Sequence, residues 1–470
     1  MMIQNRTKII ATVGPACIKM PTLKKMVNAG VNAFRVNMSH GSQEDKKEII
    51  QKIKELKMPN GERPCIIADL AGPKIRVRKT IIEFEIKKRD TVLISSENAI
   101  NEKTIIVSKG IQFSKIKKGA SIKINDGRIQ LKVEKRLSPT LLQCITTIGG
   151  KIEKGKGVNF PGITLQLPTL TPQDYEDLKL ASAEGVDWFA LSFVRSANDK
   201  AEIDKELKNL KVTIPIIAKI EKWEALQDLN AIIHKFDAVM VARGDLGVET
   251  PQEQVPLAQK MIIKQANIMG KPVIIATQML ESMVSEPVPT RAEVSDIANS
   301  IFDGSDALMV TGETAIGMHP VEVIKVLKKV ILETEKTINF DLVRQPIGQN
   351  KKTADAISHA TCQVAQDVAV ECIVTMTHSG STARMISRYR PNGRVIALTP
   401  IRKTCRRLSI VWGISPFKTI EYKNTEDITA IIEKELIARS IIKSGKKYII
   451  TGGVPVGTPG TTNYLSIQRA

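Results

Sequence analysis

Short apolar runs rich in isoleucine and valine recur along most of the chain, and helical patterns separate most of them. There are eight such runs: Lys8–Val13, Ala33–Met38, Cys65–Asp69, Asp187–Phe193, Pro215–Ile220, Ala238–Val241, Pro272–Thr277 and Asp306–Thr311. Continuous apolar runs are typical of parallel strands that are buried on both faces. Eight strands that alternate with helices predict an α/β fold of the closed (β/α)8 barrel type, a TIM barrel.

The helical segments have recognisable ends. Thr171 and Pro172 are suited to the N-cap and first position of one helix, and Gly185 ends it. Ser42 begins another helix, and Gly270 ends a third. These local signals support the alternation of strand and helix.

From residue 74 to residue 168 the helical patterns disappear, and short β-like runs separated by Gly and Asp replace them. We expect a small all-β domain inserted after the third barrel strand, beside the carboxyl-terminal mouth where this fold places its active site. This segment holds 20 Lys and Arg against 8 Asp and Glu, a net charge of +12. It can act as a cationic lid over an anion site or simply form a lysine-rich exposed sheet.

A long helix is predicted from His319 to Phe340, followed by a polar linker over 344–352. Helix and strand then alternate again, with helices expected over 354–369, from Ser381, and over 425–444. This pattern predicts a doubly wound α/β domain. The predicted domains are therefore 1–73 and 169–345 for the barrel, 74–168 for the lid and 346–470 for the carboxyl-terminal domain.

Composition excludes several classes of protein. No apolar run is long enough to cross a membrane, and the amino terminus has no signal-peptide pattern, so we expect a cytoplasmic protein. The six cysteines are too widely spaced for a metal motif, which suits reduced thiols. The net charge is +20, but basic residues are scattered and aromatic residues make up only 4%. A nucleic-acid-binding surface needs clustered basic and aromatic residues, so a nucleic-acid partner is not expected.

Charged and hydroxylated residues follow nearly every apolar run, where a barrel would gather them at one mouth. The residues at these ends, which also include Asn37 and Gly244, are Arg35, Asn37, Ser39, His40, Asp69, Lys74, Arg76, Ser192, Lys219, Glu221, Arg243, Gly244, Asp245, Thr277 and Glu313. Glu221 and Asp245 offer the hard oxygen ligands that Mg²⁺ prefers. Arg35, Arg76 and Lys219 supply positive charge for a phosphoryl group in transfer. Together they predict metal-assisted phosphate or enolate chemistry.

Lys219 and Glu221 lie two residues apart at the end of one run, so their side chains share a face of the strand. Taken alone, this pair fits a surface ion pair of little energetic value. Its place among the other strand ends favours a functional role, with Lys219 on a phosphate and Glu221 on a metal ion.

The segments ATVGPA, FRVNMSHG, AKIEKWEAL, MVARGDLGVE, ATQMLESM, PTRAEVSDIANSIFDGSDALMVTGETAIG and VPVGTPGTTN occur in this order along nearly the whole chain. Together they closely resemble the pyruvate kinase family. The resemblance implies phosphoryl transfer from phosphoenolpyruvate to ADP, giving pyruvate and ATP in the last step of glycolysis. It also implies a homotetramer that uses Mg²⁺, with Mn²⁺ as an alternative ion.

Position by position, the resemblance implies a role for each matching residue. Lys219 stabilises the phosphoryl group and the enolate, and Thr277 binds the substrate carboxylate and belongs to a proton relay. Glu221 and Asp245 are the metal ligands, and the backbone of Arg243 and Gly244 holds the carboxylate. The remaining roles are phosphate binding by Arg35 and Arg76, contact with the nucleotide by Thr12, Asn37, His40, Arg76 and Lys156, and lining or support of the pocket by Ser192 and Glu313. For Glu313 a purely structural role fits the sequence nearly as well.

One segment departs from the usual family pattern. DLAGPKIR has Leu70 and Lys74 where the family usually has a threonine and a glutamate. In potassium-dependent members the cation lies among oxygens like those of Asn37, Ser39 and Asp69. The Lys74 ammonium would provide this positive charge and would repel K⁺. We therefore expect an enzyme that does not require K⁺.

The carboxyl-terminal domain contains MTHSGSTARMISRYRP, a Thr/Ser/Gly loop that leads into a helix. Such a loop can bind phosphate through backbone N–H groups and hydroxyls, or it can be an ordinary N-capping loop. The resemblance favours an allosteric site for a sugar phosphate or nucleotide that uses Thr377, Ser379, Ser381 and Thr382.

Three other classes of protein remain as alternatives to a member of the pyruvate kinase family. A metal-dependent aldolase would share the two carboxylates but would lack the lid and the fifth-strand lysine. An inactive regulatory homologue would have lost a catalytic residue, and none is missing. A nucleic-acid-binding protein would need clustered basic and aromatic residues, and retention on heparin that vanishes at moderate salt without sequence preference would show only nonspecific charge.

Overall fold

The computed structural model describes residues 5–79, 84–338, 352–422, 424–455 and 462–470. The predicted barrel is confirmed, because eight parallel strands close on themselves in the order β1-β17-β16-β15-β14-β13-β3-β2. The strands are β1 (Lys8–Thr12), β2 (Ala33–Asn37), β3 (Cys65–Asp69), β13 (Trp188–Leu191), β14 (Ile216–Ile220), β15 (Ala238–Ala242), β16 (Val273–Ala276) and β17 (Ala307–Val310).

Local capping residues fix where several barrel helices begin. Ser42 and Thr171 each accept a hydrogen bond from the backbone three residues on, at Asp45 and Asp174, and each pair forms a capping box. The helices are α1 (Met20–Ala29), α2 (Gln43–Lys54), α3 (Pro172–Glu184), α4 (Asp199–Asn209), α5 (Trp223–Gln227), α6 (Leu229–Lys235), α7 (Arg243–Glu249), α8 (Val255–Ile268), α9 (Arg291–Phe302), α10 (Gly312–Ala315) and α11 (Pro320–Thr337), with short 3₁₀ turns η1 (Gln252–Gln254) and η2 (Glu281–Val284).

Alternate residues of the barrel strands pack on two different cores. One core joins residues such as Ile9 and Phe34 to the surrounding helices. The other contains Ile10, Ala33, Ile67 and Ile217 and no residue of a barrel helix, so it fills the barrel interior.

The predicted all-β insertion is present between β3 and α3. Its seven-stranded sheet has the order β12-β8-β9-β10-β6-β7-β4, and β11 pairs with β5. The strands are β4 (Val77–Lys79), β5 (Phe84–Ile86), β6 (Thr91–Ser95), β7 (Thr104–Val107), β8 (Ser121–Ile124), β9 (Ile129–Ser138), β10 (Leu141–Ile148), β11 (Gly150–Ile152) and β12 (Val158–Asn159). We call this insertion the lid. Residues 80–83 of the first predicted β-run lie outside the described residues.

The carboxyl-terminal domain is α/β and doubly wound, with sheet order β20-β19-β18-β21-β22 and an antiparallel edge strand β22. Its elements are α13 (Thr353–Asp367), β18 (Cys372–Met376), α14 (Ser381–Arg388), β19 (Arg394–Thr399), α15 (Arg402–Arg407), η3 (Leu408–Ile410), β20 (Ile414–Lys418), α16 (Thr425–Ile431), the π-helical turn η4 (Ile432–Ile437), β21 (Lys447–Gly453) and β22 (Thr462–Arg469). The helix predicted over 425–444 is therefore too long, since η4 ends before Ser440, which has a positive φ of 52°. Most of the predicted linker, and residues 456–461 of the VPVGTPGTTN segment, lie outside the described residues.

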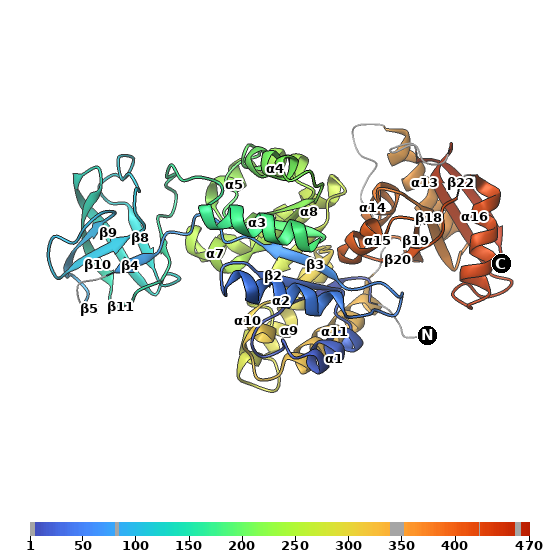
Figure 1. Ribbon diagram of the computed structural model, residues 1–470, viewed down its shortest axis with the longest axis horizontal. Coiled ribbons are helices and arrows are strands. Elements are labelled where there is room, and N and C mark those ends of the chain that lie inside the picture. The colour runs from blue at the N-terminus through green and yellow to red at the C-terminus, as the bar shows by residue number, and fades with distance from the viewer. Residues whose placement is uncertain (1–4, 80–83, 339–351, 423, 456–461) are drawn as a thin grey trace.

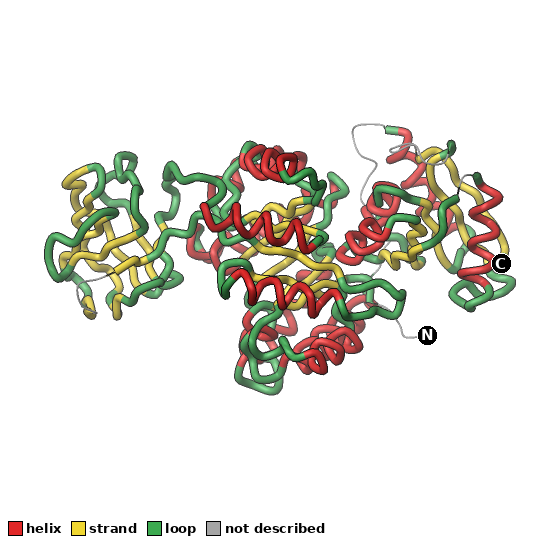
Figure 2. The backbone as a smooth tube through the Cα atoms, in the orientation of Figure 1, coloured by secondary structure: helices red, strands yellow, loops and turns green. Residues whose placement is uncertain are grey.

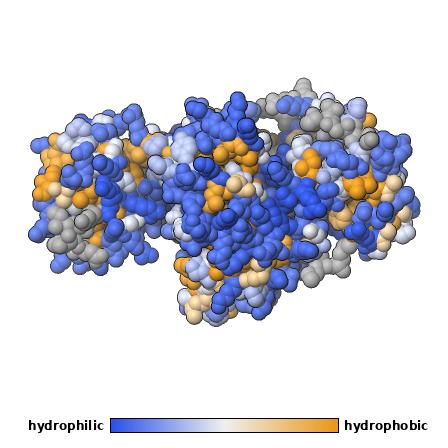
Figure 3. Space-filling view, viewed as in Figure 1, coloured by the Kyte–Doolittle hydropathy of each residue, from blue (hydrophilic) through white to orange (hydrophobic). Residues whose placement is uncertain are grey.

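The lid and the carboxyl-terminal domain lie at opposite ends of the barrel (Figure 1). The tube view shows strands throughout the lid and helices around the barrel sheet (Figure 2). Hydrophilic residues cover much of the visible face of the barrel (Figure 3), as expected when the helices turn their apolar faces inward. No helix among the described residues is both long enough and apolar enough to span a bilayer.

Candidate active site

The strand-end residues meet because barrel strands alternate between interior and exterior positions. Ile10, Ala33, Ile67, Ala190 and Ile217 belong to the interior core. The next interior position on each of these strands lies two residues further on, at the carboxyl-terminal mouth. These positions are Thr12, Arg35, Asp69, Ser192 and Lys219.

Lys219 lies at the centre of these five mouth residues. Its Nζ lies 2.7 Å from Ser192 Oγ, 3.1 Å from Asp69 Oδ1 and 3.0 Å from Glu221 Oε1. Only 9% of Lys219 is exposed. The predicted closeness of Lys219 and Glu221 is therefore present, but the ammonium is shared with Asp69 at the end of β3, two strands away in the barrel.

Asp69 connects Lys219 to Arg35. Arg35 Nε donates to Asp69 Oδ2 at 2.7 Å, and its guanidinium also contacts Thr12 Oγ1 at 3.4 Å. The sequence associates Asp69 only with the monovalent-cation group. Its position at a strand end was the available signal, but its two cationic partners could not be identified without the fold.

Burial and neighbouring charges shift the pKa values of this cluster in a consistent way. Burial disfavours the Asp69 carboxylate, but Lys219 and then Arg35 more than offset it, so the pKa of Asp69 is lowered. Burial likewise opposes the Lys219 charge, and the attraction of Asp69 and Glu221 outweighs it, so the pKa of Lys219 is raised. Lys219 therefore carries a stable positive charge at the mouth.

Glu221 and Asp245 provide two neighbouring carboxylates. Glu221 is 1% exposed, and its Oε2 accepts the Phe193 N–H at 2.8 Å. Burial raises the pKa of Glu221, Lys219 lowers it and the charge of Asp245 raises it again, leaving it above the ordinary value. Repulsion between two carboxylates is relieved by a shared cation. The described residues contain no group of three or more His, Cys, Asp or Glu suited to a metal, but Mg²⁺ often takes one or two carboxylates together with substrate oxygens.

Thr277 and Gly244 face each other at the ends of β16 and β15. Thr277 Oγ1 accepts the Gly244 N–H at 2.9 Å and donates to the Ala276 carbonyl at 2.6 Å. Thr277 has a φ of 71°, a conformation that costs energy for a β-branched residue. The Arg243 guanidinium donates to Asp296 and to the Thr277 carbonyl.

The Lys74 side chain forms an ion pair with Asp245. Its Nζ is 2.9 Å from Asp245 Oδ1, and each side chain is 25% exposed. Among the described hydrogen bonds and ion pairs, none joins Lys74 to Asn37, Ser39 or Asp69. The Asn37 side chain instead accepts the Ser39 N–H at 3.1 Å. Leu70 is buried, and its carbonyl accepts from Ser192 Oγ at 2.7 Å.

Glu313 is completely buried and holds backbone in place. Its carboxylate accepts the N–H of Thr311 at 2.6 Å and of Leu280 at 3.1 Å. Leu280 immediately precedes η2, in the segment that follows Thr277. These contacts fit support of the pocket wall rather than contact with a reactant.

The nucleotide-binding candidates divide into two groups. Thr12 lies among the interior residues at the barrel mouth, and His40 is exposed beyond the end of β2. Arg76 and Lys156 lie in the lid, where Arg76 donates to the Gly155 carbonyl at 2.9 Å and Lys156 lies 3.5 Å from Glu153. Among the described hydrogen bonds and ion pairs, none joins Arg76 or Lys156 to the Lys219 cluster.

The lid docks on α7 through contacts that sequence reasoning missed. Asn159 donates to Glu249 Oε1 at 2.7 Å, and the same oxygen pairs with Lys222. Lys123 donates to the Val248 carbonyl at 2.7 Å. These pairs join residues that are 27 to 125 positions apart, so no local signal could have revealed them.

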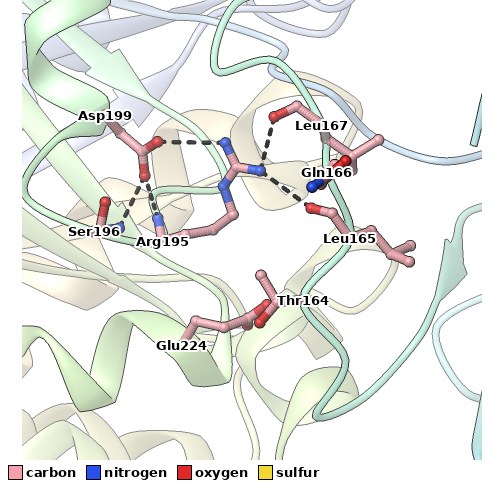
Figure 4. Close-up of a pocket in the computed structure, with 8 residues that line it drawn as sticks. All are labelled: Thr164, Leu165, Gln166, Leu167, Arg195, Ser196, Asp199 and Glu224. Carbon is pink, nitrogen blue, oxygen red and sulfur yellow. Dashed lines mark hydrogen bonds and ion pairs between the residues drawn. The ribbon is translucent and has the colours of Figure 1, made fainter. Parts of the chain in front are cut away.

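A separate cavity of about 630 Å³ lies where the chain returns from the lid to the barrel (Figure 4). Arg195 projects across it and donates to the carbonyls of Leu165 and Leu167, while Asp199 accepts from its guanidinium. This cavity therefore lies beside the lid connection, and the Lys219 cluster does not line it.

The effector candidates lie around the start of α14. Thr377 Oγ1 accepts the Gly380 N–H at 2.8 Å, and Ser379 Oγ lies 3.1 Å from Ser381 Oγ. Thr382 is buried, and its hydroxyl lies 2.9 Å from that of Thr462. Ser379 and Ser381 are thus accessible from solvent, whereas Thr382 is engaged with β22.

Comparisons with known proteins agree with this architecture. Residues 4–324 match the family model described as pyruvate kinase, barrel domain, and residues 355–468 match pyruvate kinase, alpha/beta domain. The chain is 41% identical to a pyruvate kinase of Thermotoga maritima over 98% of this chain and 99% of that one. It is 38% identical to one of Clostridium acetobutylicum over 99% of both chains. The crystal structure of a pyruvate kinase from Cryptosporidium parvum superposes with a TM-score of 0.92 at 31% identity, covering 99% of this chain and 96% of that one.

Proposed function

The chain belongs to the pyruvate kinase family, whose members are metal-dependent phosphotransferases, and on that premise we propose how its barrel mouth transfers a phosphoryl group from phosphoenolpyruvate to ADP. The observation that carries the proposal is the Lys219 ammonium, held within 3.1 Å of Ser192, Asp69 and Glu221. A buried, positively charged side chain at this point meets the main need of phosphoryl transfer, which is positioning and charge stabilisation.

Each residue of the cluster has a proposed role. The bond between phosphorus and the enol oxygen breaks, and a bond from phosphorus to an ADP oxygen forms. Lys219 and Arg35 neutralise the phosphoryl oxygens, and Lys219 also stabilises the enolate that is left. A divalent cation held by Glu221 and Asp245, with Mg²⁺ as the proposed ion and Mn²⁺ as an alternative, would add Lewis-acid charge stabilisation.

The second step is protonation of the enolate methylene carbon to give pyruvate. The Thr277 hydroxyl belongs to the proton relay, and the N–H groups of Arg243 and Gly244 bind the substrate carboxylate. In the structure the Gly244 N–H donates to Thr277 Oγ1. Substrate binding therefore exchanges this internal hydrogen bond for one to the carboxylate and frees the threonine hydroxyl for the relay.

The nucleotide is proposed to bind between the barrel and the lid. Thr12, Asn37 and His40 would contact it from the barrel, and Arg76 and Lys156 from the lid. Because both lid side chains make their described contacts within the lid, this proposal includes an approach of the lid to the barrel when ADP binds.

We also propose that the enzyme does not require K⁺. A fixed ammonium at position 74 stands near the mouth, where it supplies positive charge that would otherwise come from a bound cation. Further parts of the proposal are a cytoplasmic homotetramer and an anionic effector that binds the loop of Thr377, Ser379, Ser381 and Thr382. A sugar phosphate or nucleotide effector should shift the phosphoenolpyruvate saturation curve, and failure of such candidates to shift it would remove the effector site from the proposal.

The decisive experiment measures pyruvate formation from phosphoenolpyruvate, ADP and Mg²⁺, with and without K⁺. We expect wild-type activity in both media and a loss of about 10²- to 10³-fold in kcat for Lys219→Met. Lys235→Met, which changes an exposed lysine at the end of α6, is the matched control and should be fully active. Absence of pyruvate with wild type, or a full rate with Lys219→Met, would refute the mechanism. A dependence on K⁺ greater than a few-fold would refute only the potassium proposal.

A further inference from the structure

Lys74 occupies an unusual position between the lid and the barrel. It lies in the first connection to the lid, and its Nζ forms the ion pair with Asp245. The Nζ also lies 5.8 Å from the centre of the Phe193 ring. Gly157, which immediately precedes lid strand β12, lies so close that a β-carbon there would come within 3.1 Å of Lys74 Cε. The ammonium is therefore directed at Asp245 by packing from both sides.

A divalent cation and this ammonium compete for the same carboxylate. Mg²⁺ lies about 2.0–2.1 Å from its oxygen ligands, and Lys74 Nζ is 2.9 Å from Asp245 Oδ1. Two cations so close together repel each other strongly, because the distance is short and the site is partly shielded from water. Glu221, the other proposed ligand, accepts from Lys219 and from Phe193 N–H and keeps a lone pair on each oxygen for a metal, so the direct competition with Lys74 lies at Asp245.

We propose that Lys74 is the resident counter-ion of Asp245 and that a divalent cation must displace it to bind. The inference rests on the proposed role of Asp245 as a metal ligand. It adds a second function to Lys74, distinct from any replacement of K⁺: the lysine lowers the affinity of the substrate-free enzyme for the divalent ion. When the metal binds, the ion pair that joins the first lid connection to α7 is broken.

The test is Mn²⁺ binding to the full chain without substrates, measured by electron paramagnetic resonance of the free ion. Lys74→Gln keeps a polar side chain but removes the charge, and it should bind Mn²⁺ about two- to fivefold more tightly than wild type, as expected for loss of a partly exposed ion pair. Lys123→Gln is the matched control, because Lys123 also reaches α7 from the lid but donates to the Val248 carbonyl. Its affinity should equal that of wild type.

Three results would overturn the inference: unchanged or weaker Mn²⁺ binding by Lys74→Gln, equal tightening by Lys123→Gln, or tight binding that survives in Asp245→Asn. The last result would also refute Asp245 as a metal ligand, whereas the first two would leave that role intact. Amine acylation followed by peptide mass spectrometry gives an independent measurement. Saturating Mn²⁺ should increase labelling of Lys74 and leave Lys123 unchanged, and no increase at Lys74 would contradict displacement.

Discussion

Thr277 combines the hydroxyl proposed for the proton relay with an unfavourable backbone conformation. Its φ of 71° is the left-handed region, and the following Gln278 has a φ of 55°. The contacts that hold it there are the Arg243 guanidinium on its carbonyl and the Gly244 N–H on its hydroxyl. The strain is therefore kept by neighbours that belong to the proposed carboxylate site.

A matched pair of substitutions separates the strain from the chemistry. Thr277→Gly should be about 1 kcal/mol more stable than Thr277→Ala, because glycine adopts the left-handed region without steric cost. Both variants lack the hydroxyl, so both should lose most of the activity, while Thr277→Ser should keep much of it. Urea unfolding and pyruvate formation measure the two effects. An alanine variant as stable as the glycine variant would show that the backbone is not strained.

For individual residues, the sequence predicts which side chains lie at the barrel mouth better than it predicts which of them contact one another. Lys219 and Glu221 share a strand end, so their closeness followed from the alternation of side chains. The ion pair between Lys74 and Asp245 joins residues 171 positions apart, and no period in the chain relates them. Arg76 is predicted to bind phosphate, and in the structure its guanidinium donates one hydrogen bond to a lid carbonyl, a contact that no pattern in the sequence reveals.

Among the elements, α7 links the proposed substrate site to the lid. Its first turn contains Arg243, Gly244 and Asp245, and its last residue is Glu249. Glu249 is 4% exposed and accepts from Lys222 and Asn159. One short helix thus contains residues of the proposed substrate site and residues that contact the lid.

We expect Glu249→Gln to reduce kcat/KM for phosphoenolpyruvate about tenfold. The substitution removes the charge that pairs with partly buried Lys222, and hydrogen bonds to charged groups contribute about 1.5–3 kcal/mol. Steady-state kinetics measures the effect. Glu253→Gln, at an exposed site in η1, is the control. Equal kinetics for the two variants would show that lid docking through Glu249 does not affect the site.

Elements were more predictable than contacts because their signals are local. The capping boxes at Ser42 and Thr171 depend on residues three positions apart, and the eight apolar runs predict the barrel strands. The helix predicted over 425–444 failed because the apolar pattern continues after the backbone changes to a π-helical turn. Periodicity indicates a helix but does not show where its backbone geometry changes.

On the scale of the whole molecule, the carboxyl-terminal domain closes the end of the barrel opposite the lid. Ile410 of η3 joins the interior core of the barrel. Arg390 is 4% exposed and donates to Gly304 and Asn267, and it pairs with Asp306 just before β17. Arg390 follows α14, the helix that begins at the proposed effector loop, so one helix lies between that loop and the barrel.

Arg390→Met should separate the unfolding of the two domains. Removing one partner leaves the Asp306 carboxylate buried without its cation, which costs about 3–5 kcal/mol. Differential scanning calorimetry should show an earlier, broader or divided transition. Arg402→Met is the control, because Arg402 is 66% exposed in its pair with Glu62. A calorimetric profile identical to that of the control would mean that Arg390 does not couple the domains.

The two connections of the lid run side by side. Pro73, Lys74 and Ile75 line the same small cavity as Leu165 and Leu167, and β13 pairs directly with β3 although the lid separates them in sequence. The ends of the insertion therefore begin and finish at nearly the same place. Recombination can therefore lengthen, exchange or delete such a module without moving any barrel strand. The lid can change in sequence and length during evolution while the barrel stays the same.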